Sequence, residues 1–257
     1  MNVYWFFAEE YLAAKLQFPT GVGWKDMIEA YAATIDTAAW VVLLLMFELE
    51  TYVLEDRQFT KTVARSLHGL RAMCYAFIIY AFYGYIVNVV FLNGVTPFVD
   101  VSDLCTLAAE QWSYAVDLDE YTAITAANCS SLSAATSFFR FDSMQAAVDA
   151  EGLAAITALA WVDVINAGVW LLVVLVLEVD DRLQEHNRYE GWALQMSTAL
   201  KVVLYSTLLI AAIYWGIKGD FIDFWDAFLW LVAFVFIELN IFEWRQETQE
   251  ELAPAES

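Results

Sequence analysis

Three glutamates recur in one local pattern, and they are the side chains in this sequence best suited to binding a cation. Each stands eight residues after a tryptophan, and the three pairs are Trp40 and Glu48, Trp170 and Glu178, and Trp230 and Glu238. Carboxylate oxygens are the ligands that hard cations prefer. An acid inside an apolar stretch is costly unless it is paired or functional. The three glutamates therefore predict a cation-binding site at one depth of a membrane.

Two further polar positions accompany each glutamate. Four residues before each tryptophan stand Asp36, Asn166 and Asp226. On a helix, Asp36 and Glu48 lie about 18 Å apart along the axis and on a common side. We therefore expect two polar levels, which form either a cation pathway or a buried salt-bridge network. Two residues after each glutamate stand Glu50, Asp180 and Asn240. These last three point ~200° away, so we expect them to face headgroups or water.

Two basic residues stand at the depth of two of the glutamates. Measured from the turn of the first expected hairpin, Glu48 and Arg71 are equally distant, and Glu178 and Lys201 are equally distant from the second turn. Pairing removes much of the cost of a charge near hydrocarbon. The spacing predicts salt bridges Glu48–Arg71 and Glu178–Lys201. Glu238 has no such mate, so it must pair elsewhere, be protonated or bind a cation.

The elements that position these residues are long apolar helices. The chain has 257 residues, of which 61% are hydrophobic, and its mean hydropathy is +0.53. About 20 apolar residues in a helix cross the ~30 Å hydrocarbon layer. The composition predicts an all-α polytopic membrane protein with five transmembrane helices. We expect these at Trp24–Asp56, Thr62–Asn93, Gly152–Asn187, Gly191–Ile217 and Phe221–Gln246.

The expected helices divide the chain into six segments. Residues 24–94 form the first transmembrane hairpin, 151–218 the second, and 219–247 the fifth helix. Residues 1–23 are an interfacial N-terminal segment rich in aromatic residues, a composition typical of membrane interfaces. Residues 95–150 form an acidic extracytoplasmic loop or cap, in which we expect one or two short helices such as Met144 to Ala150. Residues 248–257 are a polar cytoplasmic tail.

The two hairpins match each other at a single offset of 130 residues. Trp40 corresponds to Trp170, Glu48 to Glu178, and the next helix continues the match without a gap, with Tyr75 corresponding to Tyr205. This predicts a parallel internal repeat, in which helices 1–2 correspond to helices 3–4 and helix 5 is a half repeat. It differs from the inverted repeats common in secondary transporters.

The charge distribution excludes some partners and orients the chain. The sequence carries 33 acids against 12 lysines and arginines, a net charge of −21. Such a surface disfavours nucleic acid and anionic headgroups. Eight of the twelve basic residues fall on one side if the N-terminus is outside, which predicts an N-out/C-in topology. Cys105 and Cys129 then lie outside the cytoplasm, where a disulfide between them is expected.

The function predicted from these patterns is cation handling. We expect a multi-pass protein of the cell membrane (inner or plasma membrane), a channel or transporter subunit that works through its intramembrane carboxylates. It would contact the lipid bilayer, an inorganic cation and further copies or other subunits in an oligomer. The alternative is a non-catalytic accessory subunit of a larger membrane complex. No nucleotide loop or catalytic motif is present in the sequence, so we expect no enzymatic activity. The sequence names neither a cofactor nor a metal.

Overall fold

A computed structural model describes residues 2–18, 21–24, 26–49, 60–135, 137–142, 144–185 and 191–252, with side chains up to residue 236 except at 47, 181, 184 and 185. The chain divides into two compact units, Met1–Ala167 and Gly168–Ser257, and the boundary falls inside helix α6 (Ala150–Glu185).

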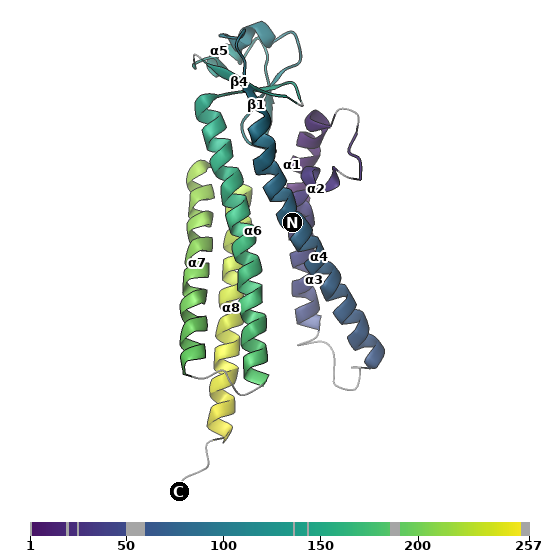
Figure 1. Ribbon diagram of the computed structural model, residues 1–257, viewed down its shortest axis with the longest axis vertical. Helices are drawn as coiled ribbons and strands as arrows, with labels where there is room; N and C mark the ends of the chain where they lie inside the picture. The colour runs from purple at the N-terminus through teal and green to yellow at the C-terminus, as the bar shows by residue number, and fades with distance from the viewer. Residues whose placement is uncertain are drawn as a thin grey trace. The chain divides into compact units, whose positions relative to one another are not determined.

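The protein is mostly helical, as its composition predicts (Figure 1). Within the described residues, three helices are long and apolar enough to cross a membrane: Lys61–Gly94, Ala150–Asp180 and Trp192–Lys218. They correspond to the second, third and fourth expected spans, so the prediction of long apolar helices is confirmed for these three. Helix α3 (Ala32–Glu48) is shorter, and helix α8 (Phe221–Leu252) has described side chains only in its first half.

The first unit begins with three helices where the sequence predicted an interfacial segment and one long span. Helix α1 (Asn2–Gln17) is followed by α2 (Met27–Ala30) and α3. The helical conformation is interrupted between α2 and α3 at Tyr31 (φ −140°, ψ 38°). Helix α4 (Lys61–Phe91) packs along α3. A Cβ on Gly84 of α4 would lie 2.9 Å from the Ile28 carbonyl oxygen, so the absence of a side chain there allows α2 to approach.

A small mixed sheet lies between α4 and α6, where the all-α prediction was wrong. Its strands are β1 (Val95–Pro97), β2 (Ser113–Ala115), β3 (Tyr121–Ala123), β4 (Phe138–Phe141) and β5 (Ala146–Asp149). The strand order is β1-β4-β5-β2-β3, and only the β2–β5 pair is parallel. The expected helix at Met144 to Ala150 is therefore mostly strand β5, because flanking strands pair with both of its edges.

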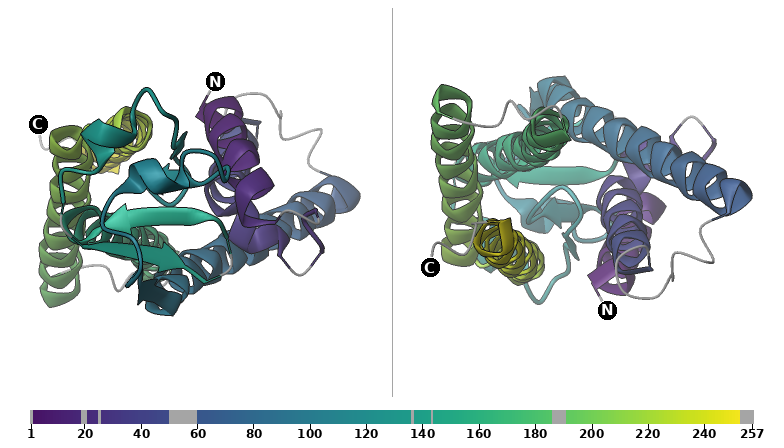
Figure 2. Two further views of the ribbon diagram at one scale, coloured as in Figure 1. Left: turned by 90° about the horizontal axis from the view of Figure 1, so that it is seen from above. Right: turned by 90° about the horizontal axis from the view of Figure 1, so that it is seen from below.

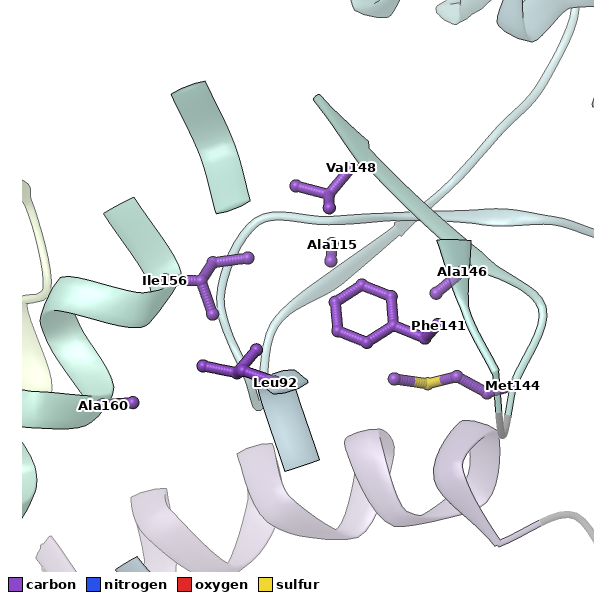
Figure 3. Close-up of a cluster of buried hydrophobic side chains, with 8 residues drawn as sticks. All are labelled: Leu92, Ala115, Phe141, Met144, Ala146, Val148, Ile156 and Ala160. Carbon is purple, nitrogen blue, oxygen red and sulfur yellow. The ribbon is translucent and has the colours of Figure 1, made fainter. Parts of the chain in front are cut away.

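Two apolar clusters hold this cap domain (residues 95–150) together. One joins the sheet to the end of α4 and the start of α6 and includes Leu92, Phe141, Val148 and Ile156 (Figure 3). The other packs around helical turn η4 (Leu104–Leu107) and helix α5 (Cys129–Leu132). A disulfide joins Cys105 to Cys129, with Cα atoms 4.8 Å apart. The cap residues therefore pack both against one another and against the ends of α4 and α6.

The second unit consists of the end of α6, α7 (Trp192–Lys218) and α8. Helix α7 ends at Gly219 in the left-handed conformation (φ 91°), where the amides of Gly219 and Asp220 both donate to the Trp215 carbonyl oxygen. Asp220 Oδ1 then accepts from the Asp223 amide and caps the start of α8. The sequence Gly-Asp thus produces a tight reversal between two apolar helices.

Candidate functional site

A buried ion pair joins α6 to α7 in the second unit. The Lys201 ammonium lies 3.0 Å from Asp180 Oδ2, and the Ser197 hydroxyl donates to the same oxygen at 2.6 Å. Asp180 is 3% exposed and Ser197 is 9% exposed. Ser197 and Lys201 stand four residues apart on α7, so they present one face of that helix. The two α7 side chains together neutralise and hydrogen-bond the buried carboxylate.

This ion pair corrects the predicted Glu178–Lys201 bridge. Glu178 is exposed and binds Arg182, one turn further along its own helix, at 2.8 Å. Asp180 lies ~200° around the helix from Glu178, and that rotation turns it toward α7. An acid does meet Lys201 near the predicted depth, but it lies on the other face of α6. The expectation that Asp180 faces headgroups or water was wrong for the same reason.

The corresponding residues of the first unit are less fully defined. Glu48 is exposed at the last residue of α3, and Arg71 is half-buried on α4. The part of the chain that the structure describes includes no ion pair between them, so the predicted Glu48–Arg71 bridge is not found. By the offset of 130 residues, the counterpart of Asp180 is Glu50, which lies outside the described residues.

The residues predicted to form the outer polar level have different surroundings. On α3, Asp36 Oδ2 accepts a long hydrogen bond of 3.5 Å from the Tyr85 hydroxyl of α4. On α6, Asn166 Oδ1 is buried and has no hydrogen-bond partner among the described residues. Asp226 is half-buried near the start of α8. The side chains of Glu238 and Asn240 lie outside the described part of α8.

Within the described residues, no group of three or more histidine, cysteine, aspartate or glutamate side chains is arranged to hold a metal ion. Each unit instead uses its acids locally. Asp180 binds a lysine, Glu178 an arginine of its own helix, and Asp36 a tyrosine.

A further buried acid, Glu10 of α1, was not singled out from the sequence. Its carboxylate accepts from the amides of Ala33 (2.8 Å) and Thr34 (3.1 Å) and from the Thr34 hydroxyl (2.5 Å). It therefore caps the first turn of α3 from another helix. Burial raises the pKa of Glu10 to about 8, and the hydrogen bonds from Thr34 and Ala33 lower it in part.

A sequence signal for Glu10 exists in its spacing. Phe6, Glu10, Ala13 and Ala14 recur at helical intervals, and all four are buried. An acid on the small-residue face of a short helix indicates a partner with hydrogen-bond donors. Which donors it meets depends on where α3 begins, and the sequence predicted no helix start at Ala32.

Comparison with known proteins adds no relative to this description. No family model, curated protein or solved structure matches the chain. Chemically, the described arrangement can hold helices together and keep charges neutral inside apolar surroundings.

Proposed function

We propose that the chain is a non-catalytic membrane subunit that binds other proteins through the apolar faces of its helices. The observation that carries this proposal is the neutralised Asp180: its charge is balanced by Lys201 and its oxygen is hydrogen-bonded by Ser197. A carboxylate in that state binds a further cation weakly. This ion pair and its hydrogen bond instead hold α6 against α7.

The surface of α7 supports the same proposal. Beside its buried positions, the helix carries a series of exposed aliphatic side chains that includes Val202, Val203, Ile210 and Ile217. In a bilayer such a face contacts either lipid or another helix. We assign part of it to a partner helix in the plasma or inner membrane, in a hetero-oligomer or homo-oligomer.

The membrane topology belongs to the proposal as well. We infer five spans in a parallel repeat, with the N-terminus and the cap outside and the C-terminus in the cytoplasm. The regular 130-residue offset and the distribution of lysine and arginine support this arrangement. The disulfide between Cys105 and Cys129 fits an external cap.

The test is site-specific photocrosslinking in native membranes. A photoreactive amino acid at Val203, which is 61% exposed, should form an adduct of one fixed mass with a protein. The same residue at Leu204, which is 5% exposed, is the matched control and should form no such adduct. The proposal fails if Val203 and the other exposed positions of α7 all form adducts with lipid alone.

Cation handling is the second candidate, and one atom favours it. Asn166 Oδ1 is buried without a hydrogen-bond partner in the described residues, and a carbonyl oxygen of this kind is a suitable ligand for a hard cation. Purified protein in liposomes should then conduct a cation, and Asn166→Leu and Glu238→Gln should each reduce the flux. Flux equal to that of protein-free liposomes would exclude this candidate for the isolated protein.

A further inference from the structure

Helix α1 has a buried face and an exposed face. Its buried face contains Phe6, Glu10, Ala13 and Ala14. The remaining side of the helix, which covers about half of its circumference at 100° per residue, is exposed. This exposed α1 face consists of Tyr4, Trp5, Phe7, Tyr11, Leu12 and Leu16.

The exposed α1 face carries no carboxylate, although the chain as a whole carries 33 acids. Of the two acids of α1, Glu10 is buried and Glu9 is half-buried at the edge of the face. The charged group on the face is Lys15, near the end of the helix, whose ammonium lies 4.1 Å from the centre of the Tyr11 ring. Its charge is suited to the phosphate of a lipid headgroup, and its stem to the apolar layer beneath.

Contacts at two points hold α1 in place. Glu10 binds the first turn of α3, and the Gln17 amide donates to the Leu118 carbonyl oxygen (2.9 Å) and the Tyr121 hydroxyl (3.2 Å) of the cap. Figure 2 shows α1 across the end of α3. The exposed face is thus presented by a helix that is already docked on both the cap and the helical hairpin.

Helix α1 contacts α2, which packs against α4, a candidate membrane span. Helix α2, which follows α1, packs Ile28 against Gly84 of the candidate span Lys61–Gly94, and the cap continues from the end of that span. Tryptophan and tyrosine are enriched at membrane–water interfaces because one part of each ring system is apolar and the other polar. Trp24, which is 88% exposed, lies in the segment between α1 and α2.

We propose that the exposed α1 face is a lipid-binding surface that lies in the boundary between headgroups and acyl chains of the leaflet on the cap side. The surface would bind zwitterionic phospholipid through its rings and through Lys15. The inference rests on the membrane location within the proposed function and is independent of the choice between partner binding and cation handling.

The test is the accessibility of a spin label on the full-length protein in phosphatidylcholine liposomes. Leu12→Cys, at a position 62% exposed, would be labelled in a Cys74→Ala background, since Cys105 and Cys129 are joined. Two labelled controls frame the result: Val99→Cys in the cap (88% exposed) for water and Ile210→Cys on α7 (66% exposed) for hydrocarbon. A second label at Tyr4→Cys, 68% exposed on the same face, checks that one substitution has not disturbed the helix.

We expect the labels at Leu12 and Tyr4 to be reached by oxygen and protected from a water-soluble nickel chelate, like the label at Ile210. Nickel accessibility equal to that at Val99 would show a water-facing helix and overturn the proposal. Protection from both reagents would also overturn it, because it would mean that protein, such as a second copy, covers the face. Loss of all crosslinking at Val203 would leave this result unaffected, so the two proposals fail separately.

Discussion

Glu10 links the docking of α1 to pH, and the effect can be tested with one substitution. The docked carboxyl has a pKa of about 8, raised from 4.5 chiefly by burial. Asp119 of the cap raises it further, while Thr34 and the Ala33 amide lower it. Glu10→Gln keeps an oxygen that can accept from an α3 amide and removes the ionisable proton.

The sign and size of the pH effect on docking follow from the pKa of Glu10 in the docked and undocked states. Because the pKa is higher in the docked state, the protonated form favours docking. This stabilisation is complete below pH 4.5 and is lost as the pH rises through about 8. At 1.36 kcal/mol per pKa unit, docking at pH 7 is weaker by about 3 kcal/mol than at low pH. The docking constant should therefore fall roughly 300-fold between these conditions.

The measurement is the distance between spin labels at Leu12→Cys on α1 and Val99→Cys in the cap, with Cys74→Ala, in liposomes at pH 4 to 9. With Glu10 present, the distance distribution should broaden as the pH rises. In the Glu10→Gln variant it should stay constant. Glu10→Ala is the control for the hydrogen bonds alone: relative to Glu10→Gln it should weaken docking by about 1 kcal/mol at every pH, because two amides of the first turn of α3 lose their acceptor.

Two results would refute this reasoning. Parallel broadening in the parent protein and in the Glu10→Gln variant would assign the pH dependence to other groups. A carboxyl carbon of Glu10 that titrates near 4.5 in an NMR experiment, with Glu10→Gln used for assignment, would show that burial does not raise its pKa.

Three further substitutions test the packing of each part. Lys201→Met leaves the charge of Asp180 buried and unpaired, so the free energy of unfolding in detergent should fall by about 3–5 kcal/mol. Adding Asp180→Asn should restore most of this stability. Equal stability of the single and double variants would contradict the ion pair. Gly84→Leu should destabilise the first unit by about 1–3 kcal/mol through overpacking, measured as a lower midpoint of thermal unfolding, and an unchanged midpoint would argue against the close approach of α2. Cys105→Ser should cost about 3 kcal/mol because the 24-residue separation to Cys129 is no longer closed, and the cap should become sensitive to protease; unchanged resistance would show that the apolar clusters suffice.

The corrected ion pair shows what helical spacing can and cannot predict. Equal distances from the turn predict that an acid near residue 178 meets Lys201 across the hairpin. These distances do not distinguish Glu178 from Asp180, because the depth of the two residues differs by only about 3 Å while their directions differ by ~200°. The rotation of α6 about its axis relative to α7 makes that choice, and this rotation depends on packing along the whole interface.

The cap and Glu10 show the effect of long-range contacts. Strand β5 has the sequence AAVD, which is equally compatible with a helix, and becomes a strand because β2 and β4 pair with it. The carboxyl of Glu10 finds its donors 23 and 24 residues later in the sequence. Neither the strands that pair with β5 nor the donors to Glu10 can be predicted from a local sequence pattern.

The sequence by itself determined the mostly helical architecture and three helices long and apolar enough to cross a membrane, because apolar length and composition are properties of contiguous residues. It also contained the spacing that brings acids and bases to similar depths. The tertiary structure alone decided which acid meets which base, where α3 begins, and that residues 95–149 include a sheet. The physical reason is that these features depend on helix rotation and on pairing between distant segments, and both are set by the packing of the folded chain.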